Sequence, residues 1–256
     1  MPSPVIIHLT DAHIKDPRRK KGAHQRLRRV AAHIAHTEDL DRVVVCDTGD
    51  MGWSMTPEEA RKIRWALDPI AGKVRVLASQ GNHDHGPKGL VRRNRNSEIW
   101  HDLIEDVTGL APARSPKVMV QRFKKTIFIV ANSAHEQTFL ARGVLGSDQI
   151  DEIKSHVEKA NRWAQRSVLL MHHCPSGGNP TKRLSDRHEL KAALVEAGGV
   201  DLMLVGHLHH DREWSSAFGA RRLLSSAPIT GEPMRYRRLS WDPDHKRFTS
   251  EWVDVD

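Results

Sequence analysis

Cysteine is scarce in this chain of 256 residues, which contains only Cys46 and Cys174. The two do not form a C-x-x-C pair, and they are far fewer than the cysteines of a small secreted domain held by disulfides. Each lies in or beside an apolar run that favours a β-strand. We therefore expect two buried free thiols in a reducing compartment, and a cytoplasmic location.

Long apolar runs are also missing, because none approaches the ~20 residues of a membrane-spanning helix. The first residues, MPSPVIIHL, carry no basic stretch ahead of an apolar one, so we expect neither a signal peptide nor a membrane partner. No repeat or low-complexity segment interrupts the chain. With 38% hydrophobic residues, residues 1–256 are expected to form one α/β domain.

Negative charge is in deficit, and the net charge of +8 favours anionic partners without defining a function. The basic residues concentrate in segments 17–29 and 88–96. Their ordinary interpretation is a solvated helix face and a loop. For 88–96 the alternative is an electropositive approach to a phosphate site, because this segment directly follows a polar motif described below.

Apolar periodicity predicts an alternation of strands and helices, and its β-α-β-α-β beginning is typical of a parallel sheet. Thr56 and Glu59 form a capping box ahead of one helix, and we expect Ser147 to cap another. Short runs after Gly206, separated by turn residues, predict antiparallel strands. Strands are expected over 5–10, 42–46, 74–79, 119–123, 126–132, 167–171 and 201–205, and helices over 23–37, 57–70, 97–107, 147–163 and 187–197.

Five of these strands are each followed by a short patch of polar residues. The patches are Asp11-Ala12-His13, Gly49-Asp50, Gly81-Asn82-His83-Asp84, His172-His173 and Gly206-His207-Leu208-His209. A lone Asp in such a place usually makes a turn or caps a helix. Because parallel strands line a ligand crevice at their carboxyl ends, the five patches together predict a rim of nitrogen and oxygen donors suited to divalent metals.

The order D-x-H, G-D, G-N-H-D, H, G-H-x-H resembles the calcineurin-like metallophosphoesterases, from Asp11 to His209. Chain size and a G-x-L-x-x-x-Q-x-x-x-I-like segment at 143–153 look closest to small bacterial class III cyclic-nucleotide phosphodiesterase-like members. The resemblance implies a four-layer αββα sandwich, in which helices flank two mixed β-sheets. It also implies two divalent or trivalent transition metal ions such as Mn, Fe, Ni or Zn.

The resemblance further implies which residues bind each ion, with Asp50 as the bridge. One ion would be bound by Asp11, His13, Asp50 and His209, and the other by Asp50, Asn82, His172 and His207. The residues alone do not separate His172 from His173. The family's H-H-x-P form implies that the first is the ligand and that His173 faces substrate or packs.

Three residues near these ligands have other implied or alternative roles. By resemblance, His83 points at the substrate as a general acid or charge stabiliser. Asp84 would accept a hydrogen bond from His83 and orient it, or would instead cap a helix. Trp53 stands where many relatives carry an acidic residue. It would be a stacking platform for a base or, as its alternative, a partly buried loop residue.

The resemblance therefore implies hydrolysis of a phosphodiester, cyclic nucleotides included, by in-line attack of a hydroxide that bridges the metals. Alternatives within the family are a phosphomonoesterase and a nuclease, and a nuclease would bind nucleic acid in a salt-sensitive groove. A non-enzymatic scaffold of the same fold is the rival from another class, but such relatives lose ligands that are present here. Physiological substrate, metal identity and oligomeric state stay open.

Overall fold

Two β-sheets form the centre of the computed structural model, which describes residues 3–15, 22–86, 96–134, 141–177 and 179–255. The first sheet has the order β11 (Arg247–Asp254), β10 (Arg235–Asp242), β1 (Val5–Leu9), β2 (Val43–Asp47) and β3 (Arg75–Ala78). The second has the order β4 (Met119–Phe123), β5 (Thr126–Val130), β6 (Arg166–Leu170), β7 (Val200–Val205), β9 (Ala220–Ser225) and β8 (Arg212–Ala217).

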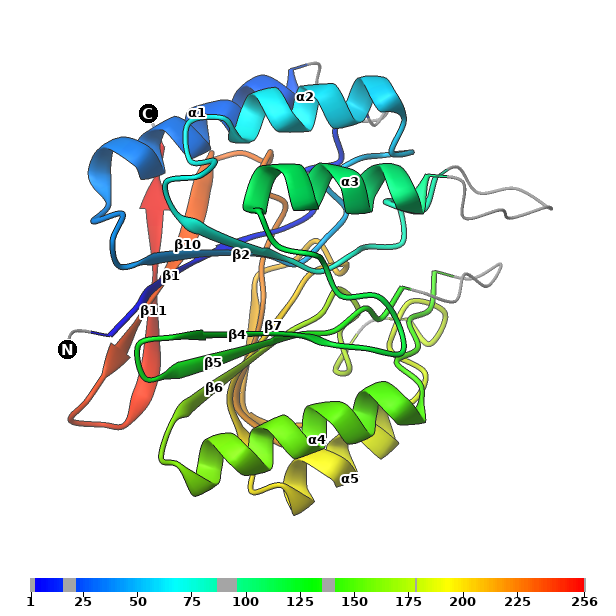
Figure 1. The fold of residues 1–256 in the computed structure, drawn as a ribbon, viewed down its shortest axis with the longest axis vertical. Helices are drawn as coiled ribbons and strands as arrows, with labels where there is room; N and C mark the ends of the chain where they lie inside the picture. The colour runs from blue at the N-terminus through cyan, green and yellow to red at the C-terminus, as the bar shows by residue number, and fades with distance from the viewer. Residues whose placement is uncertain (1–2, 16–21, 87–95, 135–140, 178, 256) are drawn as a thin grey trace.

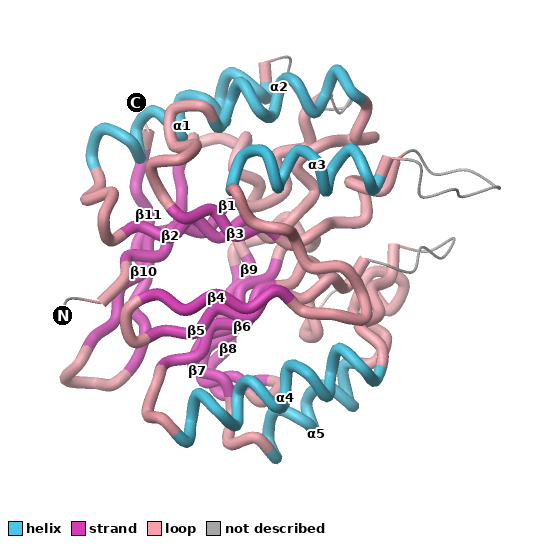
Figure 2. Tube along the Cα trace, viewed as in Figure 1, coloured by secondary structure: helices cyan, strands magenta, loops and turns pink. Residues whose placement is uncertain are grey.

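Helices cover the outer face of each sheet (Figure 1). Beside the first sheet lie α1 (Ala23–Thr37), α2 (Pro57–Leu67) and α3 (Ser97–Thr108), drawn at the top of the view. Beside the second lie α4 (Ser147–Arg162) and α5 (Arg187–Glu196) at the bottom. Figure 2 shows the strands between these two groups of helices. The predicted αββα sandwich of two mixed sheets is confirmed.

The central strands are continuously apolar because side chains alternate between two faces of each sheet and both faces are buried. In β1, Ile6 packs between the two sheets, whereas Ile7 packs against the helices. Val44 and Val45 of β2 divide in the same way. A strand that is buried on both faces has no polar face to show in its sequence. Both cysteines are buried free thiols, as predicted.

The expected antiparallel strands after Gly206 are confirmed, with one parallel pairing in addition, whereas the expected cap at Ser147 is wrong. The strands after Gly206 pair antiparallel in β8–β9 and β10–β11, but β9 also pairs parallel with β7, and β10 lies beside β1 in the other sheet. Ser147 does not cap α4, because the N-cap is Gly146 and no side chain caps it. Asp186 instead accepts hydrogen bonds from the amides of Leu145 and Gly146.

The capping box is confirmed, since Thr56 and Glu59 satisfy each other's backbone amides at the start of α2. None of the described helices is long and apolar enough to cross a membrane. Residues 17–21 and 88–95, which carry most of the two basic segments, lie outside the described residues.

Candidate metal centre

The predicted ligands lie in loops at the carboxyl ends of five strands drawn from both sheets. Asp11 and His13 follow β1, Asp50 follows β2, and Asn82 follows β3. From the second sheet, His172 follows β6, and His207 and His209 follow β7. All are buried except His209, whose side chain is 38% exposed. The sandwich therefore brings together residues that are up to 198 positions apart.

The backbone at most of these ligands is left-handed, which is uncommon for residues other than glycine. The five are Asp11 (φ 54°), His13 (φ 46°), Asp50 (φ 57°), His207 (φ 68°) and His209 (φ 57°). Such conformations cost of order 1–3 kcal/mol each and concentrate at functional sites. The concentration of left-handed residues in these loops indicates that the backbone conformation serves to direct the ligand side chains toward one another.

Motif glycines allow these loops to approach closely. A Cβ added to Gly81 would overlap the Asp50 carboxylate, and one added to Gly206 would overlap the Thr10 hydroxyl. The loops after β1 and β2 are also joined by backbone hydrogen bonds from Asp11 to Gly49 and from His13 to Asp50, both at 2.9 Å. The glycines of the motifs are thus required by packing between loops.

One group of donors is formed by Asp11, His13 and His209. The Nε2 atoms of the two histidines are 3.0 Å apart, and the Asp11 Oδ1 atom lies 3.4 Å from His13 Nε2 and 3.0 Å from His209 Nε2. Metal–nitrogen bonds of about 2.1 Å place neighbouring ligand atoms about 3 Å apart. The three donor atoms therefore have the mutual spacing of ligands to one ion.

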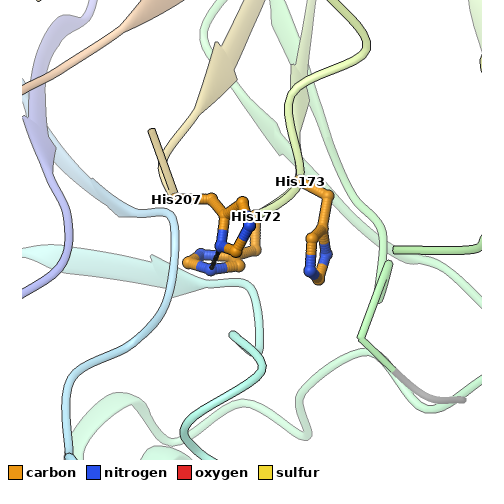
Figure 3. A group of neighbouring side chains, drawn as sticks. All are labelled: His172, His173 and His207. Carbon is orange, nitrogen blue, oxygen red and sulfur yellow. Dashed lines mark hydrogen bonds between the residues drawn. The ribbon is translucent and has the colours of Figure 1, made fainter. Parts of the chain in front are cut away.

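A second group is formed by Asp50, His172 and His207. His172 Nε2 lies 3.3 Å from Asp50 Oδ2 and 3.2 Å from His207 Nδ1. The dashed line in Figure 3 marks the contact between the two imidazoles. Asp50 Oδ2 also lies 3.7 Å from His13 Nε2. Asp50 is thus the carboxylate that contacts histidines of both groups.

Unpartnered buried atoms support a bound cation at this place. Both amide atoms of Asn82 are buried, with no hydrogen-bond partner among the described residues, and the buried Oδ1 atom of Asp11 has only the two ligand histidines beside it. A buried polar group normally has a partner, and leaving one without costs about 1–3 kcal/mol. With imidazole nitrogens beside them, these oxygens form a donor set that fits two borderline transition metal ions.

The neighbouring histidines favour the ionised form of the two aspartates. Burial would raise the pKa of Asp11, but His13 and His209 outweigh it and keep that pKa well below its ordinary value. Burial likewise opposes ionisation of Asp50, whose pKa is kept low chiefly by His172 and His83. Burial lowers the pKa of His172, but Asp50 overcomes this and raises it to about 9. Burial thus opposes the charges of these three groups, and the contacts between aspartates and histidines favour them.

Residues outside the predicted set orient the ligands. The Thr10 hydroxyl and the His207 amide donate to Asp11 Oδ2 at 2.6 and 3.0 Å, which turns Oδ1 toward the histidines. His172 Nδ1 donates to the Thr48 carbonyl at 2.7 Å, which leaves Nε2 for Asp50. Outer partners of this kind fix the tautomer and direction of a metal ligand. The hydroxyl residue directly before Asp11 was the sequence signal for the first contact, whereas the second uses a backbone carbonyl that any residue at position 48 would supply.

The two adjacent histidines differ in their surroundings. His173 Nδ1 lies 3.0 Å from the Ser133 hydroxyl, and its ring packs against Gly143. A ring nitrogen of His173 still lies within 4.8 Å of donors from His172 and His207, as the close-up in Figure 3 illustrates. Because only His172 has an ion-pair distance to Asp50, the geometry favours His172 as the ligand and His173 as its neighbour.

The expected hydrogen bond from His83 to Asp84 is wrong. Asp84 accepts from the backbone amides of Asp50 and Gly81, both at 2.9 Å, and of Gly52 at 3.1 Å. Its carboxylate is therefore occupied in joining the loops after β2 and β3. The helix-cap alternative fails for the same reason, since these amides all precede Asp84. His83 Nδ1 lies 3.0 Å from the Trp53 carbonyl oxygen.

The calcineurin-like phosphoesterase family matches residues 4–211, which is most of the chain. The chain belongs to this family, whose members use a dinuclear metal centre, and the predicted resemblance is confirmed. A search of curated proteins finds no significant match.

Solved structures share the fold at low sequence identity. A dimetal phosphatase from Danio rerio is 14% identical over all of both chains, with a TM-score of 0.61. The purple acid phosphatase PPD1 from yellow lupin is 13% identical over 98% of this chain and 51% of its own, with a TM-score of 0.65. GAP50, described as the anchor in the inner membrane complex of Plasmodium, is 10% identical over 100% of this chain and 86% of its own, with a TM-score of 0.59.

Proposed function

We propose that this protein is a dinuclear-metal phosphodiesterase, with cyclic nucleotides among its candidate substrates. The observation that carries the proposal is the Asp50 carboxylate, which contacts His172 of one donor group and His13 of the other. A two-metal site needs a shared carboxylate of this kind. Asp11, His13 and His209 would hold one ion beside Asp50, and Asn82, His172 and His207 the other.

The chemistry follows from what these residues can do around a phosphate ester. When bound, the two ions would acidify water and neutralise charge on the phosphoryl oxygens. His83, partly buried beside His13 with ring centroids 4.9 Å apart, would contact the leaving oxygen and donate a proton to it. Asp84 would act indirectly, by holding the loops that carry Asp50 and Asn82.

The scaffold alternative has a specific weakness in this chain. The described anchor protein GAP50 shares the fold, so the fold alone does not distinguish an enzyme from a scaffold. Here, however, five left-handed residues and an unpartnered Asn82 are kept at a site that a scaffold would not need. Strain and buried polar atoms without partners lower stability, which supports a retained catalytic role.

Activity on two nitrophenyl esters tests the proposal. The Mn²⁺-loaded protein is expected to cleave bis(p-nitrophenyl) phosphate with a higher kcat/KM than p-nitrophenyl phosphate. The Asp50→Asn variant is the matched control and should cleave neither. The reverse preference would make the protein a phosphomonoesterase. Nicking of DNA without cleavage of any cyclic mononucleotide would make it a nuclease, and no hydrolysis of any ester would support a scaffold.

A further inference from the structure

Trp53 contacts His83, the proposed general acid, through both its side chain and its backbone. The ring of Trp53 stacks on the ring of His83, with centroids 4.2 Å apart and planes inclined by 25°. The backbone carbonyl of the same Trp53 lies 3.0 Å from His83 Nδ1. Since a carbonyl oxygen can only accept, Nδ1 carries the proton of this hydrogen bond. One residue therefore makes two different contacts with the imidazole.

These two contacts restrict different motions of the His83 ring. The hydrogen bond fixes its rotation and assigns Nε2 to the substrate side, whereas the stacked indole limits its tilt. A ring nitrogen of His83 lies within 4.8 Å of donor atoms of His13 and Asp50. A small change in its tilt would therefore move it relative to the reacting ester.

Trp53 is itself held in place at both ends of its short loop. Its amide donates to the carbonyl of Ile14 at 3.1 Å, directly after the predicted ligand His13. On the other side, the Asn96 side chain donates to the carbonyl of Ser54 at 2.7 Å. The carbonyl that holds His83 is thus tied to the loop that carries a metal ligand.

We propose that Trp53 is the positioning residue of His83, and that it acts on the reaction only through that imidazole. The inference rests on the proposed phosphoesterase function. The family resemblance implies that Asp84 orients His83, but the Asp84 carboxylate accepts from three backbone amides. In this proposal the indole and the backbone carbonyl of Trp53 orient His83 instead. In the proposed role Trp53 acts on the imidazole and not as a platform for a nucleobase.

A double-mutant cycle tests this proposal. Trp53→Ala keeps the carbonyl and removes the indole, so kcat on a diester with an alkyl leaving group should fall about tenfold, with KM and metal content unchanged. This is less than the ~10²-fold that a displacement of ~1 Å can cost. Cleavage of the nitrophenyl diester should fall less, because its leaving group needs no proton. Trp53→Phe should restore most of the lost activity.

The His83→Ala background decides whether the effect passes through His83. Adding Trp53→Ala to His83→Ala should then cause no further loss. An equal loss in both backgrounds, or an equal loss on both leaving groups, would overturn the proposal and indicate direct contact with substrate. Trp65→Ala, at an exposed tryptophan of α2, is the matched control and should leave activity unchanged.

A spectroscopic measurement separates this proposal from the proposed function. In the metal-free protein, ring protons of His83 should be shifted upfield by the stacked indole and should return toward ordinary values in Trp53→Leu. Absence of this change would overturn the positioning role even in an active enzyme. If the wild-type protein cleaves no phosphoester, the proposed function fails while the ring-current result still reports the contact.

Discussion

Asp50 is the residue on which both halves of the candidate centre depend. Its Oδ2 atom contacts His172 and His13, and its Oδ1 atom accepts from the His83 amide at 2.8 Å. One carboxylate therefore joins the two donor groups and also anchors the loop of the proposed acid. Replacing its charge should affect more of the site than replacing any other ligand.

We predict that Asp50→Asn loses both metal ions together. Removal of the shared negative charge should weaken Mn²⁺ binding by more than about 100-fold, since even outer partners of a ligand are worth 10–100-fold. Elemental analysis of the dialysed protein measures this. His209→Ala is the comparison, because this partly exposed ligand belongs to one group and should cost one ion. The assignment of the bridge is wrong if Asp50→Asn keeps one full equivalent.

His83 and His172 should fail in different ways when replaced by alanine. His83→Ala should keep both ions and lose about 10²–10⁴-fold in kcat, the usual worth of a positioned acid. That loss should be larger for an alkyl diester than for the nitrophenyl ester, whose leaving group is stable without a proton. His172→Ala should lower metal occupancy and slow both esters alike.

Kinetics on the two esters, combined with metal analysis of each variant, separate these outcomes. Loss of metal from His83→Ala would make His83 a ligand. An equal loss on both leaving groups would make it an electrostatic stabiliser and not an acid.

At the level of elements, the loop between β2 and α2 contains Asp50 and Trp53, and a capping box at the start of α2 ends this loop. Glu59 accepts from the Thr56 amide at 3.3 Å and from the Ser54 amide at 2.9 Å, and the Thr56 hydroxyl accepts from the Glu59 amide. The capping box therefore satisfies amides of the helix and of the loop that follows Trp53.

Thr56→Ala is predicted to lower the free energy of unfolding by about 1 kcal/mol, because a helix amide loses its acceptor. Urea unfolding followed by circular dichroism measures the change. Ser147→Ala is the matched control at the start of α4, where no side chain caps the helix, and should stay within about 0.5 kcal/mol of wild type. Equal effects of the two substitutions would contradict the capping role.

At the scale of the whole molecule, the centre joins the two sheets. Asp11, His13, Asp50 and Asn82 follow strands of the first sheet, whereas His172, His207 and His209 follow strands of the second. An ion that binds both sets is bound by the folded chain and not by the unfolded one. Metal should therefore stabilise the fold as well as support hydrolysis.

Chelation is predicted to abolish hydrolysis and to lower the Tm, and Mn²⁺ should restore both. An ion present at 100 times its Kd stabilises the native state by about 2.7 kcal/mol. Differential scanning fluorimetry with and without Mn²⁺ measures the shift, and Asp50→Asn should show almost none. Restoration by Mg²⁺ as effectively as by Mn²⁺ would contradict the preference expected of imidazole ligands.

Much of the architecture follows from local patterns in the chain. Apolar runs such as 5–10 and 42–46 predict strands buried on both faces, and the capping box at Thr56 predicts the start of a helix. Both depend on neighbours within a few residues, so periodicity and capping chemistry are enough. The order of the five polar patches likewise predicts one common rim, because parallel strands end on the same side. That the 256 residues form one domain stays a prediction.

Contacts between distant residues could not be predicted in this way. Asp84 carries the expected identity, yet two of its three partners are amides 32 and 34 residues away, and together with the amide of Gly81 they occupy the carboxylate that was expected to bind His83. The N-cap of α4 is Gly146, so Ser147 is already a helical residue and does not cap, and Asp186 satisfies the amides just ahead of the helix. The parallel pairing of β9 with β7 depends on the order of strands within the second sheet. The choice of His172 over His173 as the ligand depends on the packing of the two sheets, because Asp50 follows a strand of the first sheet. Only the tertiary structure decides which donor pairs with which acceptor. Each buried polar group has several possible partners along the chain, and the local sequence does not show which of them the fold brings within hydrogen-bonding distance.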